Sequence, residues 1–287
     1  MKRWTRSDEL VWTGALPKIL PTRRFSRRGV IFAYRVDVER GTFLHRLAVW
    51  HAQDYLSGIN NRYLPLRHIA VRQGRFDIVN SPLSEAAVLG FEYGYSVETH
   101  TCLTVWEAQY GDFANGAQVL FDQYIAPGEY KLNYLSSLVV MLPHGHESVG
   151  PEHSNAWLGR FPQLCARENL RVVAPSTSAQ WFHLLRQQAT ARQRKPMIVV
   201  SPKSQLCGNG ESHSDAEELT SATNTFQPVL VEQGIDSPET VKRLVLCYGK
   251  FYYGIEAALT DGERATMAIV ASSSCTVSSE RTERLDG

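Results

Sequence analysis

The sequence has no long apolar run, no paired cysteines and almost no net charge. No apolar stretch approaches the roughly 20 residues that span a bilayer, which argues against a transmembrane protein. The first residues are basic but contain Asp8 and Glu9 and no apolar core, so we expect no secretory signal peptide. The net charge of +1 argues against a nucleic-acid surface, and the arginines of residues 23–28 are interpreted as a solvated edge.

Common catalytic and redox motifs are missing as well. The cysteines are odd in number and scattered without a C-x-x-C spacing, which indicates reduced thiols and a cytoplasmic protein. They are Cys102, Cys165, Cys207, Cys247 and Cys275. The sequence has no G-x-S-x-G elbow, no Walker loop and no G-x-G-x-x-G after an expected strand. These absences disfavour an α/β-hydrolase, a P-loop NTPase and a Rossmann enzyme.

What is present is an alternation of apolar strands and helices over most of the 287 residues. Residues 137–142 form a continuous apolar run, which is typical of a parallel strand covered on both faces. Strands are expected at 30–38, 101–110, 137–142, 170–175 and 196–201, and helices at 8–20, 85–95, 113–124, 156–168 and 178–189. This order predicts an α/β fold with a mainly parallel sheet and helices on both faces.

The composition divides the chain into two unequal parts. We expect a first domain over residues 1–204 and a polar, Gly/Ser-rich linker over 205–225. Residues 226–270 hold a single β-α-β unit and read as an incomplete C-terminal α/β domain. The polar segment 271–287 is expected to be a disordered tail.

The stretch from Ser81 to Ser96 predicts a turn and a buried helix, with Ser84 at the N-cap and Glu85 in the first turn. Burial favours the protonated form of a carboxyl group, and a helix N-terminus favours the ionised form. A glutamate held between these effects can exchange a proton with a ligand. The alternative is that Glu85 only caps its own helix and faces water.

Polar side chains occur where the central strands are expected to end. Glu107 and Gln109 end one strand, shortly before Phe113. His144 ends the next strand, and His153 follows in the loop. Ligands of open parallel sheets bind beyond the carboxyl ends of the strands, so we expect these groups to converge on an acid–base site. The alternative is that they are ordinary loop residues.

A zinc site is another possibility that histidines at this place allow. Its ligands would come from His144, His146, Glu152 and His153. Their spacing matches no standard zinc motif, so the sequence assigns no metal ligand.

Five runs of the sequence resemble the decarboxylating first component of 2-oxoglutarate dehydrogenase, a thiamine-diphosphate enzyme of the transketolase-like superfamily. They are DVERGTFLHR (37–46), LSEAAVLGFEYGY (83–95), VWEAQYGDFANGAQVLFDQYI (105–125), LPHGHESVGPEHSNA (142–156) and PKS (202–204). They keep the family's order and spacing over about residues 30–204. The run WEAQ-x-GDFANGAQ is highly specific, and the RGTF-x-HR loop separates this family from pyruvate dehydrogenase relatives.

The resemblance implies a transketolase-like pyrimidine-binding domain. Glu85 matches the glutamate that hydrogen-bonds N1′ of the cofactor pyrimidine and favours the imino tautomer, which deprotonates thiazolium C2. Phe113 matches the aromatic residue stacked on that ring, and His153 and His144 match histidines that handle substrate protons. The acyl group would pass to a lipoyl-bearing succinyltransferase. Glu107 and Gln109, which end the strand before Phe113, are also expected to contact the cofactor.

The sequence departs from the family at several positions. Leu47, Val149 and Trp157 replace a histidine, a glutamine and an arginine that are usual near the site, and residues 33–37 replace an LSGQD-like loop. The GDG…N motif, which holds diphosphate and Mg²⁺ in a separate upstream domain of the superfamily, is absent. We therefore expect Mg²⁺ to bind only through a partner: a second subunit of a homodimer or a chain carrying the diphosphate-binding domain.

Two functions stay open at this point. The chain is part of a thiamine-diphosphate-dependent 2-oxoglutarate dehydrogenase, supplies the pyrimidine-side proton relay, and is inactive without the diphosphate-binding domain. Alternatively, it is a catalytically inactive module that docks on the intact dehydrogenase, which the substitutions at Leu47, Val149 and Trp157 favour. Both hypotheses share one fold, and neither involves nucleic acid or a membrane.

Overall fold

The computed structural model describes most of the chain beyond residue 76 and short stretches before it. The described residues are 31–36, 52–53, 62–63, 71, 74, 76–80, 84–99, 101–146, 150–206, 212–220, 225–231 and 238–274. The helix expected at 8–20 and the arginine cluster at 23–28 lie outside these residues. None of the helices described is long and apolar enough to cross a membrane.

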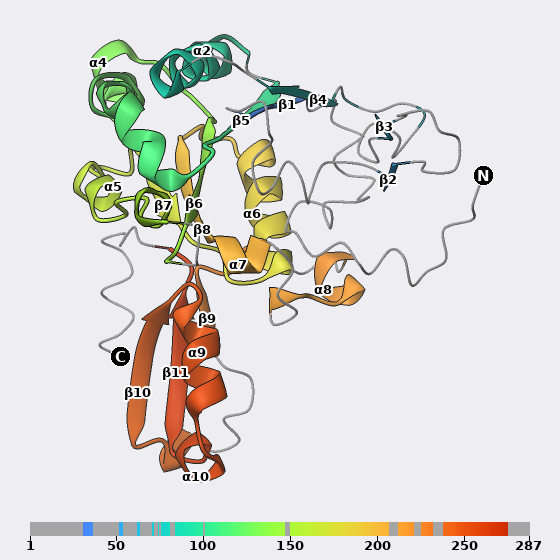
Figure 1. Cartoon of the computed structure of the whole chain (residues 1–287), viewed down its shortest axis with the longest axis vertical. Coiled ribbons are helices and arrows are strands. Elements are labelled where there is room, and N and C mark those ends of the chain that lie inside the picture. Colours follow the sequence, from blue (N-terminus) through green and yellow to red (C-terminus); the bar gives the residue numbers. More distant parts are fainter. Residues whose placement is uncertain are drawn as a thin grey trace.

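A six-stranded parallel sheet forms the larger part of the structure (Figure 1). Its strands are β1 (Ile31–Val36), β4 (Phe76–Asn80), β5 (Cys102–Glu107), β6 (Val139–His144), β7 (Arg171–Val173) and β8 (Met197–Pro202). They lie in the order β4-β1-β5-β6-β8-β7, and every neighbouring pair is parallel. A separate antiparallel pair joins β2 (Ala52–Gln53) to β3 (Arg62–Tyr63). The expected parallel sheet is confirmed.

Helices cover both faces of this sheet, as the alternation of strand side chains requires. One core cluster joins Trp106, Val140 and Ile198 of three strands to Leu89 of α2 (Glu85–Glu98) and to Phe121. The residues that alternate with these on the strands are equally buried and belong to the other face. On that face lies α6 (Ser178–Thr190), whose buried side chains include Trp181, Phe182, Leu184 and Leu185.

Two expected helices are broken up in the structure. Residues 111–132 form four short pieces: the 3-10 helix η5 (Gly111–Ala117), α3 (Gln118–Leu120), the π-helix η6 (Phe121–Ile125) and α4 (Gly128–Leu132). The helix expected at 156–168 is wrong, since only α5 (Arg160–Gln163) forms there, after the 3-10 turn η7 (Pro151–His153). Its ends are set by Trp157, Arg167 and Glu168, whose positive φ angles do not fit a helix.

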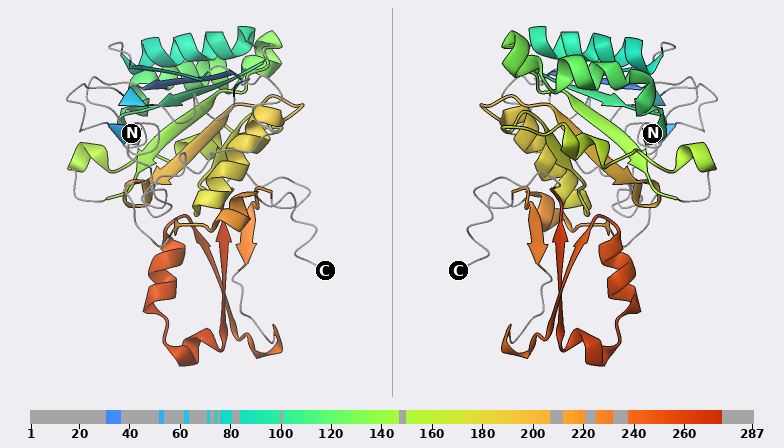
Figure 2. Two further views of the ribbon diagram at one scale, coloured as in Figure 1. Left: turned by 90° about the vertical axis from the view of Figure 1, so that its right-hand side faces the viewer. Right: turned by 90° about the vertical axis from the view of Figure 1, so that its left-hand side faces the viewer.

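The C-terminal part is a three-stranded sheet in the order β10-β11-β9 (Figure 2). The strands β10 (Arg243–Tyr248) and β11 (Met267–Ser272) are parallel and enclose α9 (Phe251–Ala258) and α10 (Asp261–Arg264), as expected for a β-α-β unit. The antiparallel strand β9 (Val229–Val231) was not expected. In the chain, α7 (Lys203–Leu206) and α8 (Ala216–Thr220) follow β8 and precede β9, and the short η9 (Pro238–Thr240) lies between β9 and β10.

The two sheets are joined by hydrogen bonds from the segment after β7. The backbone of Ala174 donates to the carbonyl of Ser273 (2.9 Å), and Val173 bridges Ser274. The Tyr253 hydroxyl of α9 donates to the carbonyl of Ser176 (2.6 Å). Residues 271–274, the first four of the segment predicted as a tail, are thus part of β11 or paired with the segment after β7, while residues 275–287 lie outside the description.

Candidate active site

Three neighbouring strands deliver the candidate residues to one edge of the six-stranded sheet. The strands β5, β6 and β8 are adjacent and parallel, so their carboxyl ends meet at this edge. Glu107 ends β5, His144 ends β6, and Lys203 follows β8 directly. The topology therefore creates the polar edge that the strand-end pattern predicts.

Three rings form a compact cluster at this edge. The rings of Tyr110 and His153 stack with centroids 4.0 Å apart and an interplanar angle of 14°. The Phe113 ring stands perpendicular to both, 5.7 Å from His153 and 5.8 Å from Tyr110. The structure thus brings together Phe113 and His153, which were predicted to converge from separate loops. Tyr110 was not predicted as part of the site.

Lys203 is a second residue that the sequence reasoning missed. It is only 2% exposed, its ammonium group donates to the backbone carbonyl of His153, and it lies 5.7 Å from the centre of the Tyr110 ring. The carbonyl bond fixes η7 against the end of β8, and a cation near an aromatic face is electrostatically favourable. Its sequence signals were its position directly after an apolar strand and its place in the PKS run at 202–204, to which no role was assigned.

The turn after β5 and the loop after β6 are locked together by a glycine and a carboxylate. The Asp112 carboxylate accepts a hydrogen bond from the backbone of Asn155 (2.7 Å). A Cβ at Gly111 would lie 2.4 Å from Cβ of Ala156 and 2.7 Å from the carbonyl oxygen of Pro143. Only glycine permits this close approach, so the GDF and SNA runs are sterically matched.

In His144 and His146, at and after the end of β6, the Nδ1 atom takes part in a hydrogen bond. His144 Nδ1 accepts from the backbone of Ala156 (3.0 Å), so this atom carries no proton and the neutral ring is protonated at Nε2. The Ser154 hydroxyl donates to the Gly150 carbonyl (2.8 Å), so it accepts from His146 Nδ1 at 3.1 Å. His144, the last residue of β6, is therefore held in one tautomer by the loop that also carries His153.

These contacts weigh against the zinc alternative. A zinc ligand needs an unprotonated ring nitrogen, and in the neutral His144 ring Nδ1 accepts a hydrogen bond while Nε2 carries the proton. Within the described part of the chain, no group of three or more His, Cys, Asp and Glu side chains is arranged to hold a metal ion.

Glu85 begins α2 and is half-buried. Ser84 occupies the N-cap position as predicted, but its side chain makes no capping hydrogen bond. The Glu85 carboxylate lies along η5, where a Cβ at Gly116 would come within 3.3 Å of Oε2. Glu85 thus contacts the same 3-10 helix that carries Phe113, at the opposite end of that helix from the ring cluster.

Glu107 and Gln109 lie beneath and beside this edge. Glu107 is completely buried at the end of β5, and Gln109 follows half-buried. Between them, the Ala108 backbone donates to the Met141 carbonyl (3.1 Å), which continues the pairing of β5 with β6. The observed ring cluster is built from Tyr110, Phe113 and His153, and cofactor contacts of Glu107 and Gln109 stay a prediction.

Comparison with known proteins agrees with this architecture. Residues 23–209 match the family described as "Transketolase, pyrimidine binding domain". The chain belongs to this family. Residues 213–272 of this pyrimidine-binding-domain protein match a second family, "2-oxoglutarate dehydrogenase C-terminal". The predicted resemblance and fold class are thereby confirmed.

Several curated relatives are similar to this transketolase-type chain over most of its length. It is 47% identical over 234 residues to a 2-oxoglutarate dehydrogenase E1 component of Haemophilus influenzae, covering 82% of the chain and 24% of that relative. The corresponding Azotobacter vinelandii protein is 48% identical over 219 residues, covering 76% of the chain and 22% of the relative. The chain therefore spans about a quarter of the length of these relatives.

Proposed function

We propose that the chain supplies the pyrimidine side of a thiamine-diphosphate site in a 2-oxoglutarate dehydrogenase. The single observation that carries the proposal is the pairing of Glu85 with the η5 helix that bears Phe113, next to the Tyr110–His153 stack. The family match gives this arrangement its ligand class, and the similarity to E1 components supports the substrate, 2-oxoglutarate.

The residues present fit an aminopyrimidine. Gly116 has no side chain, so the Glu85 carboxylate packs directly against η5 at this position. A carboxylate accepts from a ring N–H, and an aromatic side chain such as Phe113 provides an apolar surface for a heterocycle. Thiamine diphosphate, when bound, would supply the carbon nucleophile and the electron sink for decarboxylation.

The roles proposed for the chain's own groups are those implied by the resemblance to the family, and their placement supports the proposal. Glu85 exchanges a proton with the pyrimidine N1′, and Phe113 packs on the pyrimidine ring. His153, stacked on Tyr110, and His144, with its proton on Nε2, hold and transfer protons of the substrate. Glu107 and Gln109 support the cofactor from the end of β5.

The remaining requirements would be met by partners. Mg²⁺ and the diphosphate would be held by a diphosphate-binding domain in a second subunit or a separate chain. The acyl group would be accepted by a lipoyl-bearing succinyltransferase. Cys102, Cys165 and Cys247 form no disulfide with one another or with other described residues, which fits the proposed cytoplasmic location.

Complementation tests the proposal. The purified chain would be mixed with the diphosphate-binding domain of a relative, thiamine diphosphate and Mg²⁺, and CO₂ release from 2-oxoglutarate would be followed. Glu85→Gln should lower turnover about 10²–10⁴-fold, because proton transfer by a positioned side chain contributes that much. Glu98→Gln, at the exposed opposite end of the same helix, is the matched control and should leave turnover unchanged.

Two results would contradict the proposal. Equal turnover of Glu85→Gln and Glu98→Gln would remove Glu85 from the proton relay. No turnover by the wild-type chain, together with tight docking to the intact dehydrogenase, would favour the inactive binding module instead. Circular dichroism of each variant would confirm that α2 is intact.

A further inference from the structure

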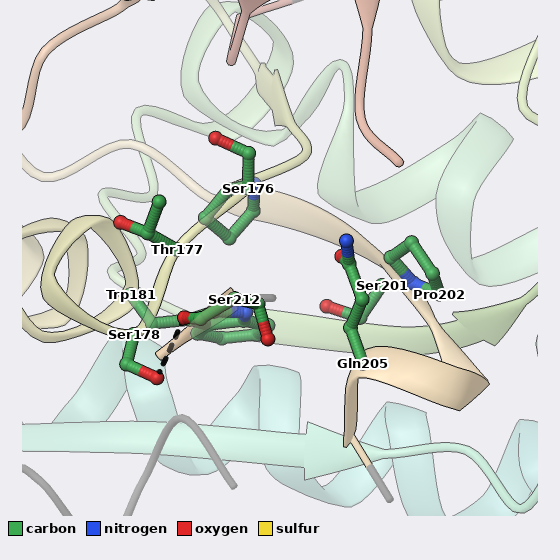
Figure 3. Close-up of a pocket in the computed structure, with 9 residues that line it drawn as sticks. Ser176, Thr177, Ser178, Trp181, Ser201, Pro202, Gln205 and Ser212 are labelled. Carbon is green, nitrogen blue, oxygen red and sulfur yellow. Dashed lines mark hydrogen bonds between the residues drawn. The ribbon is translucent and has the colours of Figure 1, made fainter. Parts of the chain in front are cut away.

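Lys203 is a buried cation at the junction of β8 and α7. It is 2% exposed and directly follows Pro202, the last residue of β8. Its neighbours Ser201 and Gln205 line a small cavity against the start of α6 (Figure 3). Lys203 instead contacts the ring cluster of the candidate site. A lysine is almost never fully buried unless it is paired, so specific contacts must hold its ammonium group.

The ammonium group of Lys203 contacts both members of the stack that Tyr110 and His153 form. It donates to the backbone carbonyl of His153, and it lies 5.7 Å from the centre of the Tyr110 ring, within the range of a cation–π interaction. The two rings stack with their centroids 4.0 Å apart. One cation at the end of β8 is therefore tied to the backbone of one partner and to the ring of the other.

The segment that carries His153 has little support of its own. It is η7, a 3-10 turn of three residues, within which the His153 backbone donates to the Gly150 carbonyl at 3.3 Å. So short a turn leaves most of its polar backbone groups to partners outside it. Asp112 holds the chain after the turn through Asn155, and Lys203 holds the turn itself. The placement of the His153 ring therefore depends on Lys203.

We propose that Lys203 is a positioning residue, which holds the His153 imidazole against Tyr110 in the orientation needed for proton transfer. A group that transfers protons must lie within hydrogen-bond reach of its substrate, and a displacement of about 1 Å can cost about 10²-fold in rate. Because Lys203 is buried and bonds a backbone carbonyl, it acts through His153. Its effect on turnover rests on the proposed function, whereas its effect on the His153 ring is a property of the chain alone.

NMR of the histidine Cε1–Hε1 groups measures the position of the His153 ring in the full chain. Spectra would be recorded at about pH 9, where an ordinary histidine is neutral, and His153→Gln identifies the signal by its loss. The face of the Tyr110 ring should shift this signal upfield in the wild type, and Tyr110→Leu should remove the shift.

Two substitutions of Lys203 then test its role in this stack. Lys203→Met keeps the length of the side chain but removes its charge and its donors, so the His153 signal should move most of the way to its position in Tyr110→Leu. Lys203→Arg keeps a cation and should retain part of the upfield shift. A His153 signal that stays fully shifted in Lys203→Met would overturn the proposal.

Lys195→Met is the matched control. Lys195 precedes the same strand at its opposite end, and its ammonium group pairs with Glu129. Its replacement should leave the His153 signal unchanged. An equal change in Lys195→Met and Lys203→Met would show a general loosening of the sheet and would overturn the proposal.

Chemical labelling tests the contact without a substitution, in case Lys203→Met does not fold. Acetylation of the wild-type chain, followed by mass spectrometry, should modify Lys203 much more slowly than Lys131, which is exposed. Equal rates of acetylation would show that Lys203 is open to solvent and would overturn the proposal.

Kinetics with the added diphosphate-binding domain distinguish positioning from substrate binding. Lys203→Met should lower kcat for 2-oxoglutarate about 10–10²-fold with little change in KM, because proton transfer is displaced, and Lys203→Arg should recover part of the loss. A higher KM at unchanged kcat would show that Lys203 binds the substrate directly and would overturn the positioning role. If the wild type shows no turnover, the proposed function fails, while the NMR spectra still decide what holds the His153 ring.

Discussion

The two sheets of this protein have similarly apolar strands but are covered very differently. Every residue of β5 and β8 is buried, and helices protect both faces of the six-stranded sheet. In the three-stranded sheet, Leu244 and Leu246 of β10 are 59% and 73% exposed, and α9 has no buried residue. The free energy of unfolding should therefore come mainly from the first sheet, because burial of apolar area is the dominant favourable term.

The same difference in packing determines how precisely a side chain is held in place. The candidate site lies at the edge of the well-packed sheet and is fixed by contacts such as Asp112 with Asn155 and Lys203 with His153. A site held by such contacts can be more precise than one on a sparsely packed segment, whose local opening has a low free energy. We expect the C-terminal sheet to exchange amide hydrogens faster than the first sheet.

The largest expected effect is a matched pair of leucine truncations. Leu142→Ala in β6 removes a completely buried side chain and should lower the free energy of unfolding by about 2–5 kcal/mol. Leu246→Ala in β10 removes a side chain that is mostly in water, so the change should stay within about 0.5 kcal/mol. Urea denaturation measures both, and equal effects would mean that the two sheets contribute alike.

The next effect concerns the steric match between two site loops. Gly111→Ala would place a Cβ against Ala156 and the Pro143 carbonyl, and such overpacking should cost about 1–3 kcal/mol. Gly94→Ala in α2 is the control, because no atom lies within 4 Å of the new Cβ. It should stabilise the chain by about 0.5–1 kcal/mol, since alanine is the better helix former. A Gly111→Ala chain as stable as wild type would contradict the close approach.

The sheet was predictable because its strands are continuous apolar runs, and an apolar run such as residues 139–142 has few other stable arrangements. The helix at 156–168 was not, because Trp157 and Glu168 adopt positive φ angles that tertiary contacts impose on ordinary residues. Helix propensity, which depends on local sequence, cannot predict where tertiary structure prevents a helix from forming. The helix expected at 113–124 was broken for a related reason, since η5 must run close to the β6 loop at Gly111.

The candidate site was predictable only in part. Phe113 and His153 follow neighbouring strands, and the rule for carboxyl ends of parallel strands was enough to bring them together. Lys203 was missed because its partner is a backbone carbonyl, which has no sequence signature. Tyr110 was missed because it was assigned only to the end of the strand predicted at 101–110, and its stacking on His153 depends on the fold of a distant loop.

A smaller effect should distinguish the local stability of the two sheets. Tyr253→Phe removes the hydrogen bond from α9 to the Ser176 carbonyl and should cost about 1 kcal/mol. Amides of β10 and β11 should then exchange faster, while those of β6 keep their protection. Tyr130→Phe is the control, because that side chain is 88% exposed and its hydroxyl should contribute little. Faster exchange throughout the molecule would show that the sheets unfold as one unit.

The smallest expected effect depends on pH and concerns His183, a buried residue of α6 whose Nε2 lies 2.8 Å from the carbonyl oxygen of Glu218 in α8. Loss of solvent lowers the pKa of His183, Arg186 lowers it further, and the contacts with Glu218 offset this only partly. The unfolded chain therefore takes up a proton below about pH 6.5, where the folded chain resists protonation, so stability is retained above that pH and falls as the solution is acidified.

His183→Gln keeps a polar group near the Glu218 carbonyl but cannot titrate. Its free energy of unfolding should depend less steeply on pH between about 7.5 and 5.5 than that of the wild type, by urea denaturation at each pH. His146→Gln, made at an exposed ring, is the control for the effect of a histidine-to-glutamine exchange as such. The difference in packing between the two sheets explains this expectation. A side chain enclosed by well-packed elements loses its contact with solvent, and its protonation then opposes folding. A slope that is equally steep in His183→Gln would show that the acid sensitivity of the chain arises elsewhere.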